Sequence, residues 1–183
     1  KLRNRLQELE SEIARLEEVV MKRERATAAE RRRALELLVA RRDPAFGQSV
    51  LMLLRDPEIR PEAIRALAAF DRPETAQRLV ALYSEFTPAE RQDAIQTLTA
   101  RPALGLALLD AIEAGVIPRS EVSALVIRQL QALEDDGLNQ RLKAVWGDIR
   151  PAAADKRERI GAIKEQLDAE TRKLANLPRG RAI

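Results

Sequence analysis

The first stretch of the chain carries apolar residues at alternating spacings of four and three, with charged residues between them. A heptad stripe of this kind is typical of a coiled-coil helix, so we predict a heptad-patterned N-terminal helix over residues 1–26. The candidate coiled-coil contacts are Leu2, Leu6, Leu9, Ile13, Leu16 and Val20.

Two kinds of partner could cover this stripe: a second copy of the chain or another part of the same chain. In a parallel dimer Arg5 would attract Glu10 of the other helix, whereas Glu12 would face Glu17 and repel it. About three heptads make a marginal dimer on their own. Both alternatives stay open, and a homodimer through this helix is one candidate assembly.

From residue 27 to residue 147 the pattern changes to short amphipathic helices in pairs, with a period of about 30 residues. The predicted helices cover residues 28–41 and 44–55, 58–70 and 73–86, 88–101 and 102–114, and 119–133 and 137–146. Turns with Pro or Gly separate them. Asp43 and Thr87 are expected to cap helices, and Pro44 is expected in a first helical turn.

Each predicted helix is apolar on one face, as in the run Leu106, Leu109 and Ile112. A single pair of such helices cannot enclose its own apolar stripe, so the pairs are expected to stack on one another. The predicted fold is all-α: a HEAT-like α-solenoid of about four helical pairs, flanked by long N- and C-terminal helices. Its second helices are expected to line a concave face that offers a surface for a partner.

The last section, residues 148–183, is predicted to form a charged amphipathic helix and a linker. Pro151 and a short run of alanines precede the helix, which starts at Asp155 and places Ile160, Ile163 and Leu167 on one face. Because the chain starts at Lys1 without a Met and stops after Ile183, we expect it to be a piece of a longer protein and the linker to lead to a further domain.

The composition of the chain excludes several kinds of functional site. Hydrophobic residues make up 45% of it, and it has no Cys and no His, so disulfides, thiolate nucleophiles, imidazole bases and the usual zinc ligands are excluded.

The net charge is +3, and from Pro151 onward there are eight basic and five acidic residues, so the first 150 residues carry 24 of each. This balance does not favour a nucleic-acid-coating surface. No stretch of about 18 apolar residues is present, so we expect no membrane span.

Three groups of residues have the composition of a possible site, but each is better explained by an ordinary structural role. Arginines 31–33 could contact phosphate, but three consecutive residues fan around a helix and acidic residues lie nearby. The carboxylate pairs at 17–18 and 135–136 resemble neither an acid/base pair nor a calcium loop. Tyr83 and Trp146 are expected in the core. No catalytic, cofactor-binding or metal-binding residue is predicted.

Several stretches of the chain resemble a known family. They are Leu54-Arg55-Asp56-Pro57 with Arg60 to Leu67, then Trp146 to Pro151, then Asp155-Lys156, and finally Leu177 to Ile183. Residues 28–183 are similar to the HEAT-like region of the large multidomain haem-binding proteins of planctomycetes and their relatives, in which a c-type cytochrome domain follows. The resemblance implies haem c in the parent protein and an exported or periplasmic location. The Cys-x-x-Cys-His haem motif is absent from this chain, so no haem ligand is carried over.

The sequence therefore predicts a non-enzymatic scaffold or spacer that positions an adjacent c-type cytochrome domain and mediates protein-protein contacts. The alternatives are a coiled-coil dimerisation module that carries a solenoid, and a nucleic-acid-binding HEAT-like solenoid. A Cys-x-x-Cys-His motif encoded shortly after Ile183 would favour the spacer next to a c-type cytochrome domain.

Overall fold

The computed structural model describes residues 2–22, 24–42 and 45–147 of the 183-residue chain. The chain divides into two compact units, residues 1–145 and residues 146–183. The predicted cap Asp43, the first-turn residue Pro44 and the predicted helix that starts at Asp155 all lie outside the described residues.

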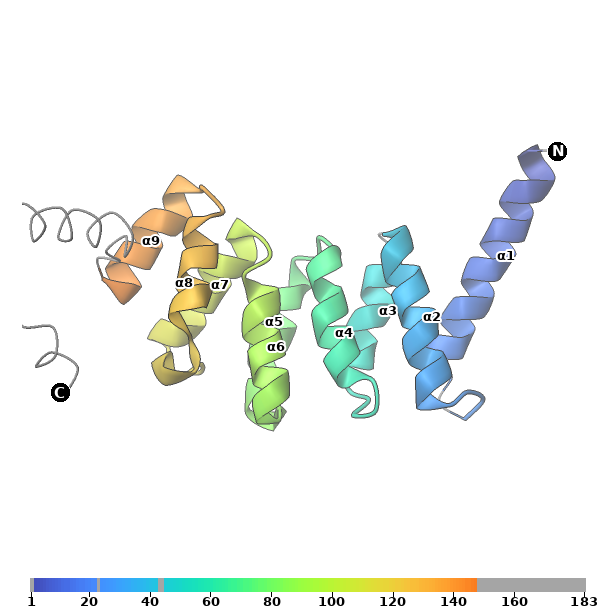
Figure 1. The fold of residues 1–183 in the computed structure, drawn as a ribbon, viewed down its shortest axis with the longest axis horizontal. Coiled ribbons are helices and arrows are strands. Elements are labelled where there is room, and N and C mark those ends of the chain that lie inside the picture. The colour runs from blue at the N-terminus through green and yellow to red at the C-terminus, as the bar shows by residue number, and fades with distance from the viewer. Residues whose placement is uncertain (1, 23, 43–44, 148–183) are drawn as a thin grey trace, which may run out of the picture. The chain divides into compact units, whose positions relative to one another are not determined.

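The described residues are all-α, with no strand (Figure 1). The α-helices are α1 (Leu2–Met21), α2 (Ala28–Arg41), α3 (Phe46–Leu53), α4 (Arg60–Ala66), α5 (Glu74–Ala81), α6 (Pro88–Leu98), α7 (Pro102–Glu113), α8 (Ala124–Gln131) and α9 (Asp136–Trp146). Three short 3₁₀ helices accompany them: η1 (Leu67–Ala69), η2 (Tyr83–Glu85) and η3 (Arg119–Glu121). Of the fold prediction, the all-α class is confirmed.

Two of the helices start at a capping box. Thr27 and Thr87 each accept a hydrogen bond from the backbone N–H three residues on, while the glutamate at that position accepts one from the cap backbone. The backbone N–H and then the hydroxyl of Thr27 hold the pKa of Glu30 below its usual value. The predicted cap at Thr87 is confirmed, and Pro88 occupies the first turn of α6.

Several predicted helices are shorter in the structure. The helix expected from residue 58 starts at Arg60, with Pro61 in its first turn, where a missing backbone N–H is tolerated. The segments expected to stay helical up to Phe70 and Phe86 finish as η1 and η2. The helix expected over 119–133 is split, because the Ser123 side chain accepts a hydrogen bond from the Val126 N–H and starts a new helix.

Contacts in the unit of residues 1–145 follow a regular order. α2 packs on α4 and α4 packs on α6, while α5 packs on α7, so helices two places apart in the order are neighbours. α1 packs on α2 and α3. Among the described residues, every buried hydrophobic side chain lies between Val20 and Leu142. The core therefore runs from the end of α1 to α9.

The predicted core aromatics differ in their environments. Tyr83 is buried, and its hydroxyl donates a hydrogen bond to Glu121 Oε2 over 2.7 Å. Burial and this carboxylate raise the pKa of Tyr83 well above its usual value. Trp146 is only half-buried. The core prediction is thus confirmed for Tyr83 and wrong for Trp146, which is the last residue of α9.

Polar contacts link pairs of residues that are 25 to 33 positions apart in the sequence. Examples are the pairs Arg31–Asp56, Arg65–Asp93, Arg91–Glu121 and Arg141–Asp110, together with the hydrogen bond from Arg101 to the Phe70 carbonyl. This separation matches the period of the hydrophobic pattern, so many of the arginines join one helical pair to the next.

Candidate functional site

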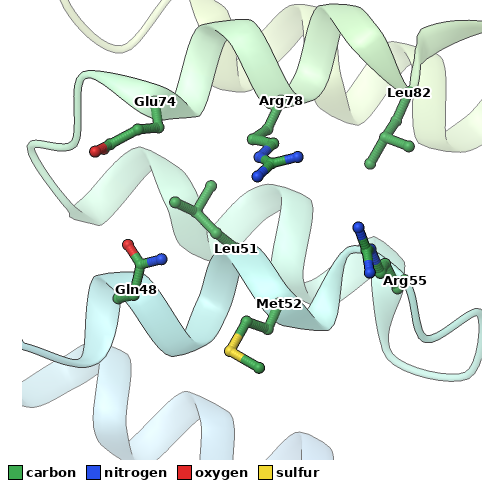
Figure 2. A pocket seen from close by; sticks show the side chains of 7 residues that line it. All are labelled: Gln48, Leu51, Met52, Arg55, Glu74, Arg78 and Leu82. Atoms are coloured by element: carbon green, nitrogen blue, oxygen red, sulfur yellow. The ribbon is translucent and has the colours of Figure 1, made fainter.

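A groove of about 310 Å³ lies between α3 and α5 (Figure 2). Its walls come from the second helices of the first two predicted pairs. The residues that line it are Gln48, Leu51, Met52, Arg55, Glu74, Arg78 and Leu82.

Helical spacing explains why these side chains meet. Residues three or four apart share a helix face, and the lining positions on α3 and its end are 48, 51, 52 and 55, while those on α5 and its end are 74, 78 and 82. Val50 and Leu53 of α3 are buried in the core. The groove is therefore the outward side of two amphipathic helices.

Apolar side chains contribute part of the groove lining. Leu51 is 8% exposed, whereas Met52 is 59% exposed, one of the most exposed large hydrophobic side chains of the described residues. Methionine is flexible and polarisable and is common on surfaces that adapt to a partner. An exposed methionine beside a nearly buried leucine provides apolar area that a partner could cover.

Two guanidinium groups extend over this apolar surface. Figure 2 shows Arg55 and Arg78 on opposite walls of the groove, with Glu74 at the end away from Arg55. Both arginines are exposed, and neither makes an ion pair with another described residue. They differ in this from the arginines that join successive helical pairs, so their positive charge is available to a ligand.

The groove lining supplies groups that can hold a ligand. Glu74 is the single carboxylate in its lining, and no nucleophile or base stands next to it. Guanidinium groups present planar donors that match carboxylates, often two bonds at a time. Within the described part of the chain, no three His, Cys, Asp or Glu side chains converge as a metal site would require.

No protein-family model, curated protein or solved structure matches the chain. Among the described helices, none combines the length and the apolar character needed to cross a bilayer.

The heptad positions of α1 are in two kinds of environment. Val20 is fully buried, Ile13 and Leu16 are half-buried, and Leu6 and Leu9 are 58% and 45% exposed. The side chain of Leu2 lies outside the described part. The structure thus gives the C-terminal half of the stripe an intramolecular role and leaves the N-terminal half uncovered.

The three consecutive arginines of α2 form no common patch. Arg31 is buried, donating from Nε to the Val20 carbonyl and from Nη2 to Asp56 Oδ2 over 2.6 Å. Arg32 pairs with Glu62. The sequence predicts that the three fan apart, but it does not predict the burial of Arg31.

The carboxylate pairs considered in the sequence have structural partners. Glu18 pairs with Lys22 and Arg25, and its pKa is lowered, first of all by the hydrogen bond from Lys22. Asp135 Oδ1 accepts a hydrogen bond from the Leu138 N–H at the start of α9. These contacts are those of a helix surface and a helix cap.

Sequence reasoning missed the groove itself. Arg55 and Arg78 are 23 positions apart, and each stands in an ordinary amphipathic pattern. Only the packing of the helices brings α3 and α5 to the two sides of one groove. The one local signal was Met52, an apolar residue on the polar side of a short helix.

Proposed function

We propose that the chain is a non-catalytic helical-repeat scaffold, a HEAT-like α-solenoid whose second helices bind an acidic, amphipathic segment of a partner protein. The observation that carries the proposal is the α3–α5 groove, whose lining combines Leu51 and the exposed Met52 with Arg55 and Arg78, two arginines without an ion pair to any described residue.

The order of helix contacts supports the stacking of repeats. In a solenoid each repeat contacts its neighbours, so first helices meet first helices and second helices meet second helices. The pairings α2–α4, α4–α6 and α5–α7 follow that rule. The arginine contacts between helices 25 to 33 residues apart also recur at the repeat length.

The charge and shape of the groove support an acidic amphipathic ligand. A helix or extended segment would place an apolar side chain on Leu51 and Met52 and a carboxylate at each guanidinium. Desolvation by the bound segment would strengthen these two ion pairs relative to exposed ones. A basic segment would meet Arg55 and Arg78 with like charge.

The test uses three fluorescent synthetic helical peptides with the same apolar positions and with acidic, neutral or basic polar positions. We expect fluorescence anisotropy to show that the full chain binds the acidic peptide most tightly. Reversing both charges, in the variant Arg55→Glu/Arg78→Glu, should shift the preference to the basic peptide. The affinity for the acidic peptide should fall as salt is added.

Arg128→Glu is the matched control, because Arg128 of α8 is also exposed and unpaired among the described residues. This variant should bind the acidic peptide like the original chain. Equal binding of the acidic peptide by the original chain and the double variant, or no binding of any peptide, would contradict the groove as the binding site.

The spacer function next to a c-type cytochrome domain is a second proposal, supported by the resemblance of residues 54–67 and 146–151. It requires that the coding sequence of the parent protein specify a Cys-x-x-Cys-His motif after Ile183. A stop codon or an unrelated domain at that place would remove the haem connection and leave the scaffold proposal unchanged.

A further inference from the structure

The N-terminal half of α1 is a helix with an uncovered apolar stripe. Figure 1 shows that this half of α1 points away from α2, and Leu6 and Leu9 are 58% and 45% exposed. Farther along the same stripe Val20 is fully buried. The change occurs in the middle of the helix, near Glu12, which pairs with Arg41 at the end of α2.

The charges beside the uncovered stripe identify the kind of partner. With Leu6 at heptad position a and Leu9 at d, positions e and g are Arg3 and Arg5 in the first turns and Glu10 and Glu12 one heptad later. All four side chains are exposed. Arg3, Arg5 and Glu10 make no ion pair with any other described residue.

These charges are also poorly placed within α1 itself. The first turn of α1 contains no acidic residue, although negative charge is favoured at a helix N-terminus and positive charge is not. Glu8 and Glu12 are four apart on one helix, which is a repulsive spacing. A partner that brought carboxylates to the first turns would offset the positive charge there. Arginines of the partner beside Glu10 and Glu12 would reduce the repulsion between Glu8 and Glu12.

We propose that a second copy of this chain covers the stripe, with the two α1 helices antiparallel. Placing Leu6 opposite Leu9 of the second copy brings Arg3 beside Glu10 of that copy and Arg5 beside Glu12. The twofold axis repeats every contact, so the interface contains two leucine layers and four attractive ion pairs.

The parallel arrangement is less favourable. It would pair Arg5 with Glu10 but set Glu12 against Glu17 of the other copy, and it would bring together the two positively charged first turns. It would also align the C-terminal halves of the two helices, where Val20 is already buried in its own chain. Antiparallel pairing uses the N-terminal half, which is uncovered.

The first test is the mass of the full chain by sedimentation at concentrations up to the millimolar range. We expect a reversible monomer–dimer equilibrium. Leu6→Asp should leave only monomer, whereas Leu125→Asp, on the exposed surface of α8, should dimerise like the original chain; Leu125 is 56% exposed, close to the value for Leu6. A monomer at all concentrations overturns the proposal, as does a dimer that Leu6→Asp leaves intact.

The second test is charge exchange between two variants. Arg3→Glu/Arg5→Glu and Glu10→Arg/Glu12→Arg should each be monomeric alone, because all their flanking charges repel, and should form a heterodimer when mixed. Failure of the mixture to form heterodimer, in chains whose circular dichroism matches the original, would contradict the assigned ion pairs.

The third test is orientation by disulfide formation, which is clean because the chain has no cysteine of its own. In the antiparallel dimer Leu6→Cys should cross-link to Leu9→Cys of another copy faster than either variant cross-links to itself. Faster cross-linking of each variant to itself would identify a parallel dimer and overturn the antiparallel assignment.

Discussion

Arg31 and Arg32 stand next to each other in the sequence and have opposite environments. Arg31 has a 1% exposed side chain and joins three segments, since it contacts the Val20 carbonyl of α1 and Asp56 after α3. Arg32 is 44% exposed and pairs with Glu62 on the surface. A charge that is buried and paired is costly to break, because its partner stays behind without a counterion.

Arg31→Ala is therefore expected to lower the free energy of unfolding by about 3 kcal/mol, since Asp56 and the Val20 carbonyl each lose the hydrogen bond that Arg31 donates. Urea denaturation followed by circular dichroism measures the change. Arg32→Ala is the neighbouring control and should cost less than about 1 kcal/mol, as expected for an exposed ion pair. Equal losses for the two variants would mean that the Arg31 contacts contribute no more than a surface pair.

At the scale of the helices, the sequence predicted most of the elements and some of their ends. The bounds of α2 were predicted without error, because a capping threonine and a regular apolar face mark them. The interruption at Ser123 was missed, since a serine inside an apolar run also fits an exposed helix position. The burial of Arg31 and the position of Arg55 and Arg78 on one groove depend on contacts between helices, which local patterns do not encode.

The packing of α7 gives a prediction at this scale. A Cβ atom on Gly105 would lie 2.8 Å from Leu130 Cδ2 and 3.1 Å from Leu138 Cδ1. Both leucines are fully buried, so they have little room to move. We expect Gly105→Ala to lower the free energy of unfolding by about 1 kcal/mol, because this overlap outweighs the gain in helix propensity.

Gly137→Ala is the matched control for Gly105→Ala. Its Cβ atom would meet only Asp135 Oδ1, at 3.4 Å, so the helix gain should remain and the variant should be slightly more stable than the original chain. Thermal unfolding of both variants shows whether each substitution raises or lowers the stability. A stabilising effect of Gly105→Ala would show that α8 and α9 can move away from α7 at little cost.

At the scale of the whole chain, the structure divides into two compact units, residues 1–145 and residues 146–183. The unit of residues 1–145 contains the buried arginine, the groove and every buried hydrophobic residue that the structure describes.

A shortened chain of residues 1–147 should therefore fold by itself. We expect the same midpoint of urea denaturation as for the full chain, because the buried side chains from Val20 to Leu142 are all retained. Circular dichroism and hydrogen exchange would check that α9 stays helical. A midpoint lowered by a large fraction would show that residues 148–183 contribute to the stability of the helices before them.

The arginine contacts have one more consequence, which concerns how such a chain changes length in evolution. Each contact joins a residue to one in the next helical pair, as Arg65 joins Asp93 and Arg91 joins Glu121, 28 and 30 residues away. In the proposed repeat arrangement, an insertion of half a helical pair between donor and acceptor would turn the following helix and separate the two groups. Variation among descendants of this gene should accordingly come in steps of about 30 residues.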